Sequence, residues 1–283
     1  MDSVETIMVV RHAVAAARRA GKTIGLVPTM GALHAGHTSL MDAARVACDF
    51  VVVSIFVNPT QFGPQEDLEA YPRPLEDDLA LCRDHGADLV FIPSVDEMYG
   101  RETLTHVEVT QLTEPLCGEK RPGHFHGVTT VCTKLFNIVQ ADQAFFGQKD
   151  AQQTVVIKRL VADLNFPLEI VVCPTVRARD GLAISSRNRY LNTAQRHDAT
   201  HLYRSLCACR RAIEQGERQG AVLERIVREI LEAVPSLEVE YVAVVDADTL
   251  TPVKNLTHAA LVAVAAKLGS ARLIDNIVVD VTG

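Results

Sequence analysis

The sequence lacks several features that mark membrane, secreted and nucleic-acid-binding proteins. No apolar run reaches the roughly 18 residues that span a bilayer, and the first residues lack the basic segment and apolar core of a secretion signal. A net charge of -7 leaves no broad basic surface for a phosphate backbone. We therefore expect a cytoplasmic protein that binds neither a membrane nor a nucleic acid.

Metal and redox motifs built from cysteine are also missing. The chain has seven cysteines, an odd number, and no two have C-x-x-C spacing. Most lie in apolar segments, which indicates buried, reduced thiols. Internal repeats and low-complexity tracts are absent as well, and 48% of the residues are hydrophobic. The 283 residues can therefore fill the core of one large domain or two smaller ones.

Apolar runs rich in Val, Ile and Phe alternate with amphipathic segments in the first part of the chain. Continuous apolar runs are typical of strands that are buried on both faces, and therefore of a parallel sheet covered by helices. The fold class that we expect is α/β, with a Rossmann-like parallel sheet flanked by helices. The predicted strands lie at residues 24–28, 50–57, 88–92, 144–146 and 168–173.

The pattern changes after about residue 175. A long helix is predicted from Thr193 to roughly Gly216, and a second helix ends near Leu231. Three further apolar runs follow, around residues 239–245, 259–265 and 272–279. We predict two domains, a first at 1–175 and a smaller C-terminal α+β domain at 176–283.

The segment after the first predicted strand contains His34, Gly36 and His37. Ligands of parallel sheets bind beyond the carboxyl ends of the strands, and here a glycine-rich turn leads into a predicted helix. Two imidazoles three residues apart can point the same way, toward backbone N–H groups and the positive end of the helix dipole. The pattern indicates a triphosphate site. Histidines that only pack or cap, or a zinc site with a third ligand, are the alternatives.

Two later segments have chemistry that fits the same ligand. Lys149 follows the strand at 144–146, where its ammonium would neutralise charge on an α-phosphate under attack, and Asp150 could bind Mg²⁺ or orient the lysine. A solvated charge pair beside a turn is the alternative. The polar loop at 179–188 contains two serines followed by an arginine, which suit phosphate oxygens.

Side chains for a small acid and for a metal ion can also be proposed. Gln61 and Gln153 follow two of the predicted strands, and a carboxamide both donates to a carboxylate and accepts from a hydroxyl, as a hydroxy acid requires. Asp77 and Asp78 could hold a metal ion. An acidic helix start is the other interpretation of these two residues, and the one that we favour.

Six motifs together resemble the pantothenate synthetase family, in the expected order between residues 24 and 191. They read PTMGALHAGH, VSIFVNPTQFG, DLEAYPR, RPGHFHGV, FFGQKDAQQ and GLAISSRNRYL. The H-x-G-H motif alone would indicate only the wider nucleotidyltransferase superfamily. Ile184 departs from the family, which more often has methionine there, but the two side chains are apolar and similar in size.

The resemblance implies a ligase that condenses pantoate with β-alanine through a pantoyl-adenylate, with cleavage of ATP to AMP and pyrophosphate and a requirement for Mg²⁺. It implies a homodimer, pantoate binding by Gln61 and Gln153, and catalytic roles for His34, His37, Lys149 and Arg187. The ATP-binding positions that it implies are Met30, Gly31, Ala32, Leu33, His34, Ala35, Gly36, His37, Gly147, Gln148, Lys149, Asp150, Val176, Ile184, Ser185, Ser186 and Arg187.

The family usually assigns proton donation to the position of His37. We interpret both histidines as stabilisers of phosphate charge, because a carboxylate nucleophile is already ionised at neutral pH. Two other functions remain as alternatives. One is another adenylyl-transferring enzyme of the superfamily, such as a tRNA synthetase-like protein, against which the acidic charge argues. The other is a nucleotide-binding module without activity, against which the full set of phosphate-directed side chains argues.

Overall fold

The computed structural model describes residues 1–64 and 66–281. The chain divides into two compact units. The first comprises Met1–Glu114, Gly118–Gly147 and Val156–Pro174, and the second comprises Pro115–Cys117, Gln148–Val155 and Thr175–Gly283. The second unit thus includes two short segments that precede the predicted boundary at residue 175. The division into domains at 1–175 and 176–283 stays a prediction.

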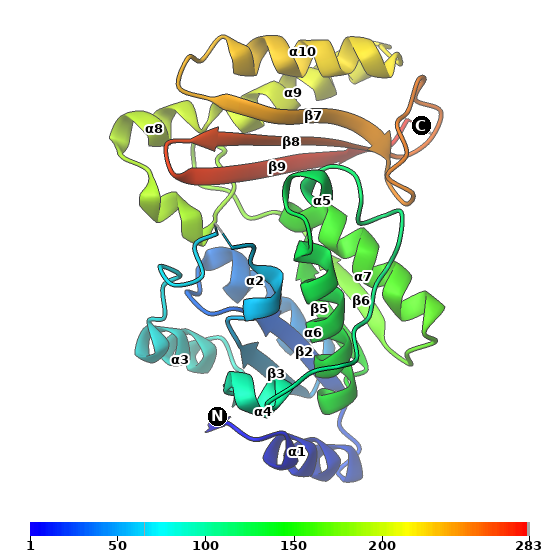
Figure 1. Ribbon diagram of the computed structural model, residues 1–283. Coiled ribbons are helices and arrows are strands. Elements are labelled where there is room, and N and C mark those ends of the chain that lie inside the picture. The colour runs from blue at the N-terminus through cyan, green and yellow to red at the C-terminus, as the bar shows by residue number, and fades with distance from the viewer. Residues whose placement is uncertain (65, 282–283) are drawn as a thin grey trace. The chain divides into compact units, whose positions relative to one another are not determined.

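The first unit is built on a six-stranded parallel sheet with the strand order β1-β4-β3-β2-β5-β6 (Figure 1). Its strands are β1 (Asp2–Val4), β2 (Ile24–Thr29), β3 (Phe50–Ile55), β4 (Leu89–Phe91), β5 (Gln143–Gly147) and β6 (Glu169–Cys173). The sequence predicted every strand except β1. That strand has three partly or fully exposed residues, too few to show a pattern.

Helices cover both faces of this sheet. On one face, Val27 of β2 and Phe145 of β5 pack in one cluster with Met41. On the other face, Phe146 meets the ring of Phe136 edge-on, with 6.5 Å between the ring centroids. Neighbouring residues of a strand face opposite sides of the sheet, so both sides are apolar. This burial explains why the strands appear in the sequence as continuous apolar runs, and it confirms the predicted α/β class.

The helices of the first unit follow the strands in the usual alternation. They are α1 (Ile7–Arg19), α2 (Ala35–Ala47), α3 (Leu75–Asp84), α4 (Val95–Tyr99) and α6 (His124–Val139), with the 3-10 turn η1 (Pro59–Gln61) after β3. Two further helices contain residues of both units, α5 (Cys117–Lys120) and α7 (Ala151–Asp163).

The second unit contains a three-stranded antiparallel sheet in the order β7-β8-β9. Its elements are η2 (Gln148–Asp150), η3 (Ser186–Tyr190), α8 (Thr193–Asp198), α9 (His201–Glu214), α10 (Gly220–Glu232), β7 (Glu238–Asp246), β8 (Ala260–Leu268) and β9 (Ala271–Val279). Leu206 of α9, Leu223 of α10 and Val262 of β8 share one core. The predicted smaller α+β domain is confirmed as a fold.

The single long helix predicted from Thr193 is wrong, because the structure contains two helices there. The break lies at Ala199 and Thr200. The backbone N–H of Thr200 bonds to the carbonyl of His197, three residues back, and its hydroxyl bonds to the same carbonyl at 2.7 Å. Threonine competes in this way with the regular helical hydrogen bond.

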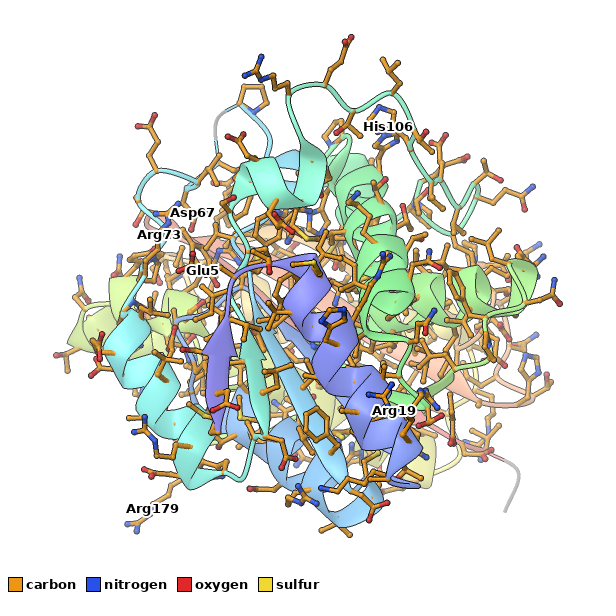
Figure 2. The ribbon with its side chains drawn as sticks, turned by 90° about the horizontal axis from the view of Figure 1, so that it is seen from below. Glu5, Arg19, Asp67, Arg73, His106 and Arg179 are labelled. Carbon is orange, nitrogen blue, oxygen red and sulfur yellow. The ribbon has the colours of Figure 1, made fainter. Side chains whose placement is uncertain are left out.

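The described residues include exposed charges and buried cysteines. Among residues 1–64 and 66–281, no helix is long and apolar enough to cross a membrane. Charges of both signs are exposed, Glu5, Arg19 and Arg73 among them (Figure 2). All seven cysteines are free, and only Cys207 is partly exposed. Burial raises the pKa of Cys132 to about 12, as expected of an unreactive core thiol.

Candidate active site

The strand order places β2 next to a topological switch point. From β2 the chain passes to β3 and β4 on one side, and it then returns to β5 and β6 on the other side. The loops that leave β2 and β5 therefore diverge at the carboxyl edge of the sheet, which is where open parallel sheets bind their ligands. The loop after β2 leads to His34 and His37, and Lys149 comes two residues after the end of β5.

The loop after β2 has an unusual backbone that a buried carboxylate stabilises. Gly31 and Ala32 both have a positive φ, 78° and 49°, and for alanine this conformation is costly. Asp78 is 2% exposed, and its oxygens accept hydrogen bonds from the backbone nitrogens of Ala32 at 2.8 Å and Leu33 at 2.7 Å. A side chain at position 31 would meet the Asp78 carboxylate at 2.9 Å. Only glycine fits this position.

The same contacts bear on the metal ligands proposed from the sequence. Asp77 and Asp78 lie in the first turn of α3, which confirms the helix-start interpretation. The carboxylate of Asp78 is engaged by backbone N–H groups, and Asp77 is exposed. In the part of the chain that the structure describes, no group of three or more His, Cys, Asp or Glu residues is placed to hold a metal ion. A metal at Asp77 and Asp78 stays a prediction that these contacts do not favour.

The two histidines of the motif lie side by side where α2 begins. Their rings stack with 4.0 Å between centroids and 24° between planes. His34 caps the helix, and its Nδ1 accepts a hydrogen bond from the backbone nitrogen of Gly36 at 3.1 Å. In the neutral ring the hydrogen must then sit on Nε2. The positive end of the α2 dipole lies at the same place, so the arrangement suits an anion.

Gln61 is held beside the loop after β2. It ends η1 and is 8% exposed. Its side-chain oxygen accepts from the amide of Asn58 at 3.1 Å, and its amide nitrogen lies 3.0 Å from the sulfur of Met30. The hydroxyl of Tyr99 donates to the side-chain oxygen Oδ1 of Asn58 at 2.7 Å. The structure therefore brings Gln61 and Met30, two residues predicted to bind substrates, into direct contact.

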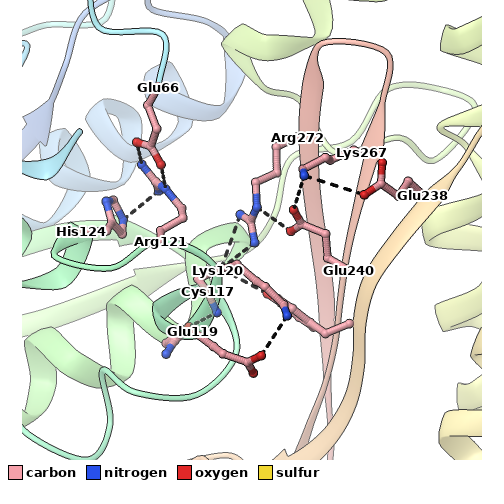
Figure 3. Close-up of polar contacts among 12 residues, drawn as sticks. Glu66, Cys117, Glu119, Lys120, Arg121, His124, Glu238, Glu240, Lys267 and Arg272 are labelled. Carbon is pink, nitrogen blue, oxygen red and sulfur yellow. Dashed lines mark hydrogen bonds and ion pairs between the residues drawn. The ribbon is translucent and has the colours of Figure 1, made fainter. Parts of the chain in front are cut away.

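A charged cluster that the sequence did not assign to the site orients the backbone of Gln61. Arg121 donates to both oxygens of Glu66, each at 2.6 Å (Figure 3). The Nδ1 of His124 lies 2.9 Å from the carbonyl oxygen of Gln61 and donates to it, while Nε2 lies 3.0 Å from Arg121. Burial would raise the pKa of Glu66, but the hydrogen bonds and charge of Arg121 hold it below its ordinary value.

A glycine lets α6 pack directly on η1. A Cβ atom at Gly127 would lie 2.4 Å from the carbonyl oxygen of Thr60 and 2.5 Å from the nitrogen of Gln61. The amide of Asn58 also donates to the Gly127 carbonyl at 3.2 Å. The signal for this contact was visible in the sequence, since Gly127 lies inside the RPGHFHGV motif, but spacing alone does not show what the glycine touches.

In the second unit, the short turn η2 contains Lys149 and Asp150. The side chain of Lys149 is 20% exposed, and its ammonium lies 3.7 Å from a carboxylate oxygen of Asp150. Gln153 is partly exposed in the first turn of α7. Its neighbour Gln152 is buried and engaged, since it donates to the Pro115 carbonyl at 2.7 Å and accepts from the nitrogen of Cys117 at 2.9 Å. Of these two glutamines, only Gln153 has a side chain that is exposed enough to contact a ligand.

The loop that follows Thr175 forms a compact hairpin. The backbone nitrogen of Ile184 donates to the carbonyl of Val176 at 3.0 Å. The hydroxyl of Ser185 then accepts from the backbone nitrogen of Arg187 at 3.3 Å and so begins η3. The hairpin thus brings Val176 next to Ile184, a predicted ATP-binding residue eight positions later, within the second unit.

A parallel sheet with a switch point, whose first loop leads to stacked H-x-G-H histidines at a helix N-terminus, defines a nucleotide-binding α/β protein. The family model described as pantoate-beta-alanine ligase matches residues 2–278. The chain belongs to this family, as the motifs suggested. Membership assigns it the reaction for which the family is named, the ligation of pantoate to β-alanine.

Individual relatives cover almost the whole chain. The pantothenate synthetase of Moorella thermoacetica is 55% identical and covers 99% of both chains, and that of Acetivibrio thermocellus is 50% identical over 99% of this chain and 100% of its own. A crystal structure of pantothenate synthetase from Thermus thermophilus has a TM-score of 0.93 at 47% identity, and covers 98% of this chain and 99% of that one.

A further solved structure is described as containing ligands. It is the pantoate-beta-alanine ligase from Francisella tularensis complexed with beta-gamma ATP and beta-alanine. Its TM-score is 0.79 at 32% identity, and the alignment covers 98% of this chain and 97% of that one.

Proposed function

We propose that the chain ligates pantoate to β-alanine through a pantoyl-adenylate, and that His34 and His37 bind the phosphates of ATP. One observation carries this proposal, the stacked imidazoles at the N-terminus of α2 on the carboxyl edge of the sheet. The Francisella tularensis relative, with its bound beta-gamma ATP and beta-alanine, supports both substrates for this chain.

The chemistry has two steps. In the first, a carboxylate oxygen of pantoate attacks the α-phosphorus of ATP, a new C–O–P linkage forms, and pyrophosphate leaves with the electrons of the broken bond. In the second, the free amine of β-alanine attacks the acyl carbon, AMP leaves, and the nitrogen loses a proton. Neither histidine needs to act as a base in the first step, because the pantoate carboxyl group is ionised at neutral pH.

The side chains that we assign to ATP act mainly by stabilising negative charge on its phosphates. The Nε2–H of His34 can donate to a phosphate oxygen, since its Nδ1 is already an acceptor for Gly36. The Lys149 side chain is only 20% exposed, and a partly desolvated ammonium stabilises developing charge more strongly than a fully solvated one. Arg187 adds a planar cation. The full set that we propose for ATP is Met30 to His37, Gly147 to Asp150, Val176, and Ile184 to Arg187.

We assign the binding of pantoate to the side-chain amides of Gln61 and Gln153. Gln61 is oriented by Asn58 and by the cluster around Arg121, so its position is fixed before a substrate arrives. Gln153 has a partly exposed side chain at the start of α7. Each can donate to a carboxylate and accept from a hydroxyl, the two groups that pantoate offers.

Mg²⁺ is proposed as the ion that accompanies ATP. It usually takes one or two protein carboxylates together with phosphate oxygens and water. Asp150 fits, because its carboxylate is half exposed beside Lys149. Asp78 fits poorly, since backbone N–H groups engage its oxygens. The ion would supply positive charge to the departing pyrophosphate. We also propose a cytoplasmic location, as expected from the sequence, and the homodimer that the resemblance implies.

The function is tested by release of AMP from purified protein with ATP, Mg²⁺, pantoate and β-alanine, each omitted in turn. We expect AMP to accumulate only when all four are present. The rival adenylyl-transferring function predicts instead that activity depends on an amino acid and tRNA and is indifferent to pantoate. A nucleotide-binding module without activity would release no AMP under any of these conditions.

A further inference from the structure

Two adjacent polar residues of β9 are buried in the second unit, although neither belongs to a recognised motif. Asp275 is 2% exposed and Asn276 is 4% exposed. A buried polar side chain needs hydrogen-bond partners, and its partners show what it holds in place. Both residues have partners in segments that we assign to ATP.

Asn276 organises the turn η2. Its amide nitrogen donates to the backbone carbonyls of Gln148 at 3.0 Å and Lys149 at 2.9 Å. Its side-chain oxygen Oδ1 accepts from the side-chain amide of Gln148 at 3.1 Å. Two carbonyl acceptors on one side require the NH₂ group there, which fixes the orientation of the amide. One carboxamide therefore fixes the backbone from which the Lys149 side chain extends.

Asp275 organises the loop after Thr175. Its two oxygens accept from Arg177 at 2.6 and 2.9 Å, as a bidentate pair whose carboxylate is almost fully buried. Arg177 also donates to the carbonyl of Gly181 at 3.1 Å and stacks on the ring of Tyr203, 3.8 Å from its centroid. A side chain at Gly181 would lie 2.4 Å from Tyr203, so this part of the loop packs closely.

Hydrogen bonds also link Asp275 and Asn276 to each other, directly and through Arg177. Arg177 donates to the backbone carbonyl of Asn276 at 3.3 Å, and the backbone nitrogen of Asn276 donates to Asp275 at 2.8 Å. Arg177 directly follows Val176 and pairs across the hairpin with Ala183, the residue before Ile184. A single short stretch of β9 thus contacts both segments through side chains whose spacing the strand fixes.

We propose that Asp275 and Asn276 are positioning residues, which set the Lys149 turn and the 176–187 loop relative to each other so that Lys149 and Arg187 reach the phosphates of one ATP. This inference rests on the proposed function. It gives β9 a role in the reaction, whereas the apolar pattern of the sequence predicted only a strand there. Misplacement of a reacting group by about 1 Å can lower a rate about a hundredfold.

The test is a double-mutant cycle between Asn276→Ala and Lys149→Ala, measured as the single-turnover rate of pantoyl-adenylate formation. We expect Asn276→Ala alone to lower the rate about ten- to a hundredfold. In the Lys149→Ala background it should lower the rate less than about twofold, because its effect acts through the lysine. Asn255→Ala, at an exposed asparagine of the same unit, is the matched control and should leave the rate unchanged.

A purely structural role gives a different result. If Asn276→Ala lowers the rate equally in both backgrounds, or has no effect in the wild-type background, the inference is wrong. The proposed function fails separately, when the unmodified protein shows no pantoate-dependent release of pyrophosphate. The two failures are therefore distinguishable.

The role of the Asp275–Arg177 ion pair is tested with a conservative substitution, because removing one partner of a buried ion pair is strongly destabilising. Arg177→Lys keeps the charge but loses the bidentate geometry. We expect it to raise the KM for ATP about tenfold in the wild-type background and to have little further effect in Arg187→Ala. If Arg177→Lys raises the KM for ATP equally in both backgrounds, or in neither, Asp275 has no positioning role.

Discussion

The imidazole rings of His34 and His37 lie stacked at 4.0 Å, and the backbone of Gly36 fixes the first ring by donating to its Nδ1. The neutral ring of His34 then has its hydrogen on Nε2, from which it can donate to an anion. The pair is therefore suited to binding a polyanion at the end of α2, where the helix dipole adds to the attraction. This arrangement gives the first prediction.

We expect His37→Ala and Lys149→Ala each to lower the rate of adenylate formation at least about a hundredfold, because each removes a group that stabilises charge in the transition state. The measurement is rapid-quench detection of pyrophosphate in a single turnover. Circular dichroism should show an unchanged fold in both variants. Near-normal rates in both would show that these side chains do not carry the chemistry.

A second prediction concerns the buried Asp78 carboxylate, which accepts hydrogen bonds from the loop after β2. Asp78→Asn turns one accepting oxygen into a donor that faces a backbone N–H of Ala32 or Leu33. We expect the free energy of unfolding to fall by about 1–3 kcal/mol, measured by urea denaturation. The neighbouring exposed Asp77→Asn is the control and should leave both stability and the Mg²⁺ dependence of the rate unchanged. A raised Mg²⁺ requirement in either variant, with normal stability, would instead support the metal site first proposed there.

Gly127 provides a third prediction. In Gly127→Ala the new methyl group would collide with the backbone of Thr60 and Gln61, so α6 must move away from η1. We expect lower thermal stability and a raised KM for pantoate, because Gln61 shifts with η1. Gly123→Ala, where a Cβ meets no atom within 4 Å, is a weaker control because its φ of 82° is itself unfavourable for alanine. If Gly127→Ala leaves both the melting temperature and the KM for pantoate unchanged, the close contact is not functionally important.

The fourth prediction concerns pH and the second unit. Partial burial would raise the pKa of Asp246, but hydrogen bonds from Thr249, Asp248 and His258 outweigh it and lower the pKa to about 2 from 3.8. The folded state therefore gains stability above pH 3.8 and loses it as the pH falls toward 2. Asp246→Asn should cost about 1 kcal/mol at pH 7, a value that allows for screening by solvent.

Chemical denaturation of wild type and Asp246→Asn between pH 2 and pH 7 checks this sign. The stability difference should be constant near neutral pH and shrink below about pH 4. A difference that grows as the pH falls would contradict the account of the Asp246 hydrogen bonds.

Much of the fold could be predicted because local patterns and global structure agree. Strands buried on both faces leave continuous apolar runs, and Phe145 and Phe146, which face opposite layers, show why. The edge strand β1 could not be predicted, since three residues of mixed exposure have no period. The break between α8 and α9 was missed because the alternative hydrogen bonds of Thr200 are not encoded in apolar spacing.

The candidate site was predictable where function demands special residue types at a strand end, as with His34, His37 and Lys149. Supporting residues were not predictable in the same way. Asp78 and Arg121 contact the loop after β2 and the backbone of Gln61 in the first unit, and Asn276 contacts η2 in the second; all three act on backbone groups that no motif displays. Such contacts become visible only when the elements are packed.

The central claim is that the chain activates pantoate as an adenylate before β-alanine reacts. Exchange of labelled pyrophosphate into ATP, measured with pantoate and Mg²⁺ but without β-alanine, tests it most directly. We expect exchange that requires pantoate in the unmodified protein and is lost in Lys149→Ala. Absence of exchange until β-alanine is added, or exchange without pantoate, would contradict it.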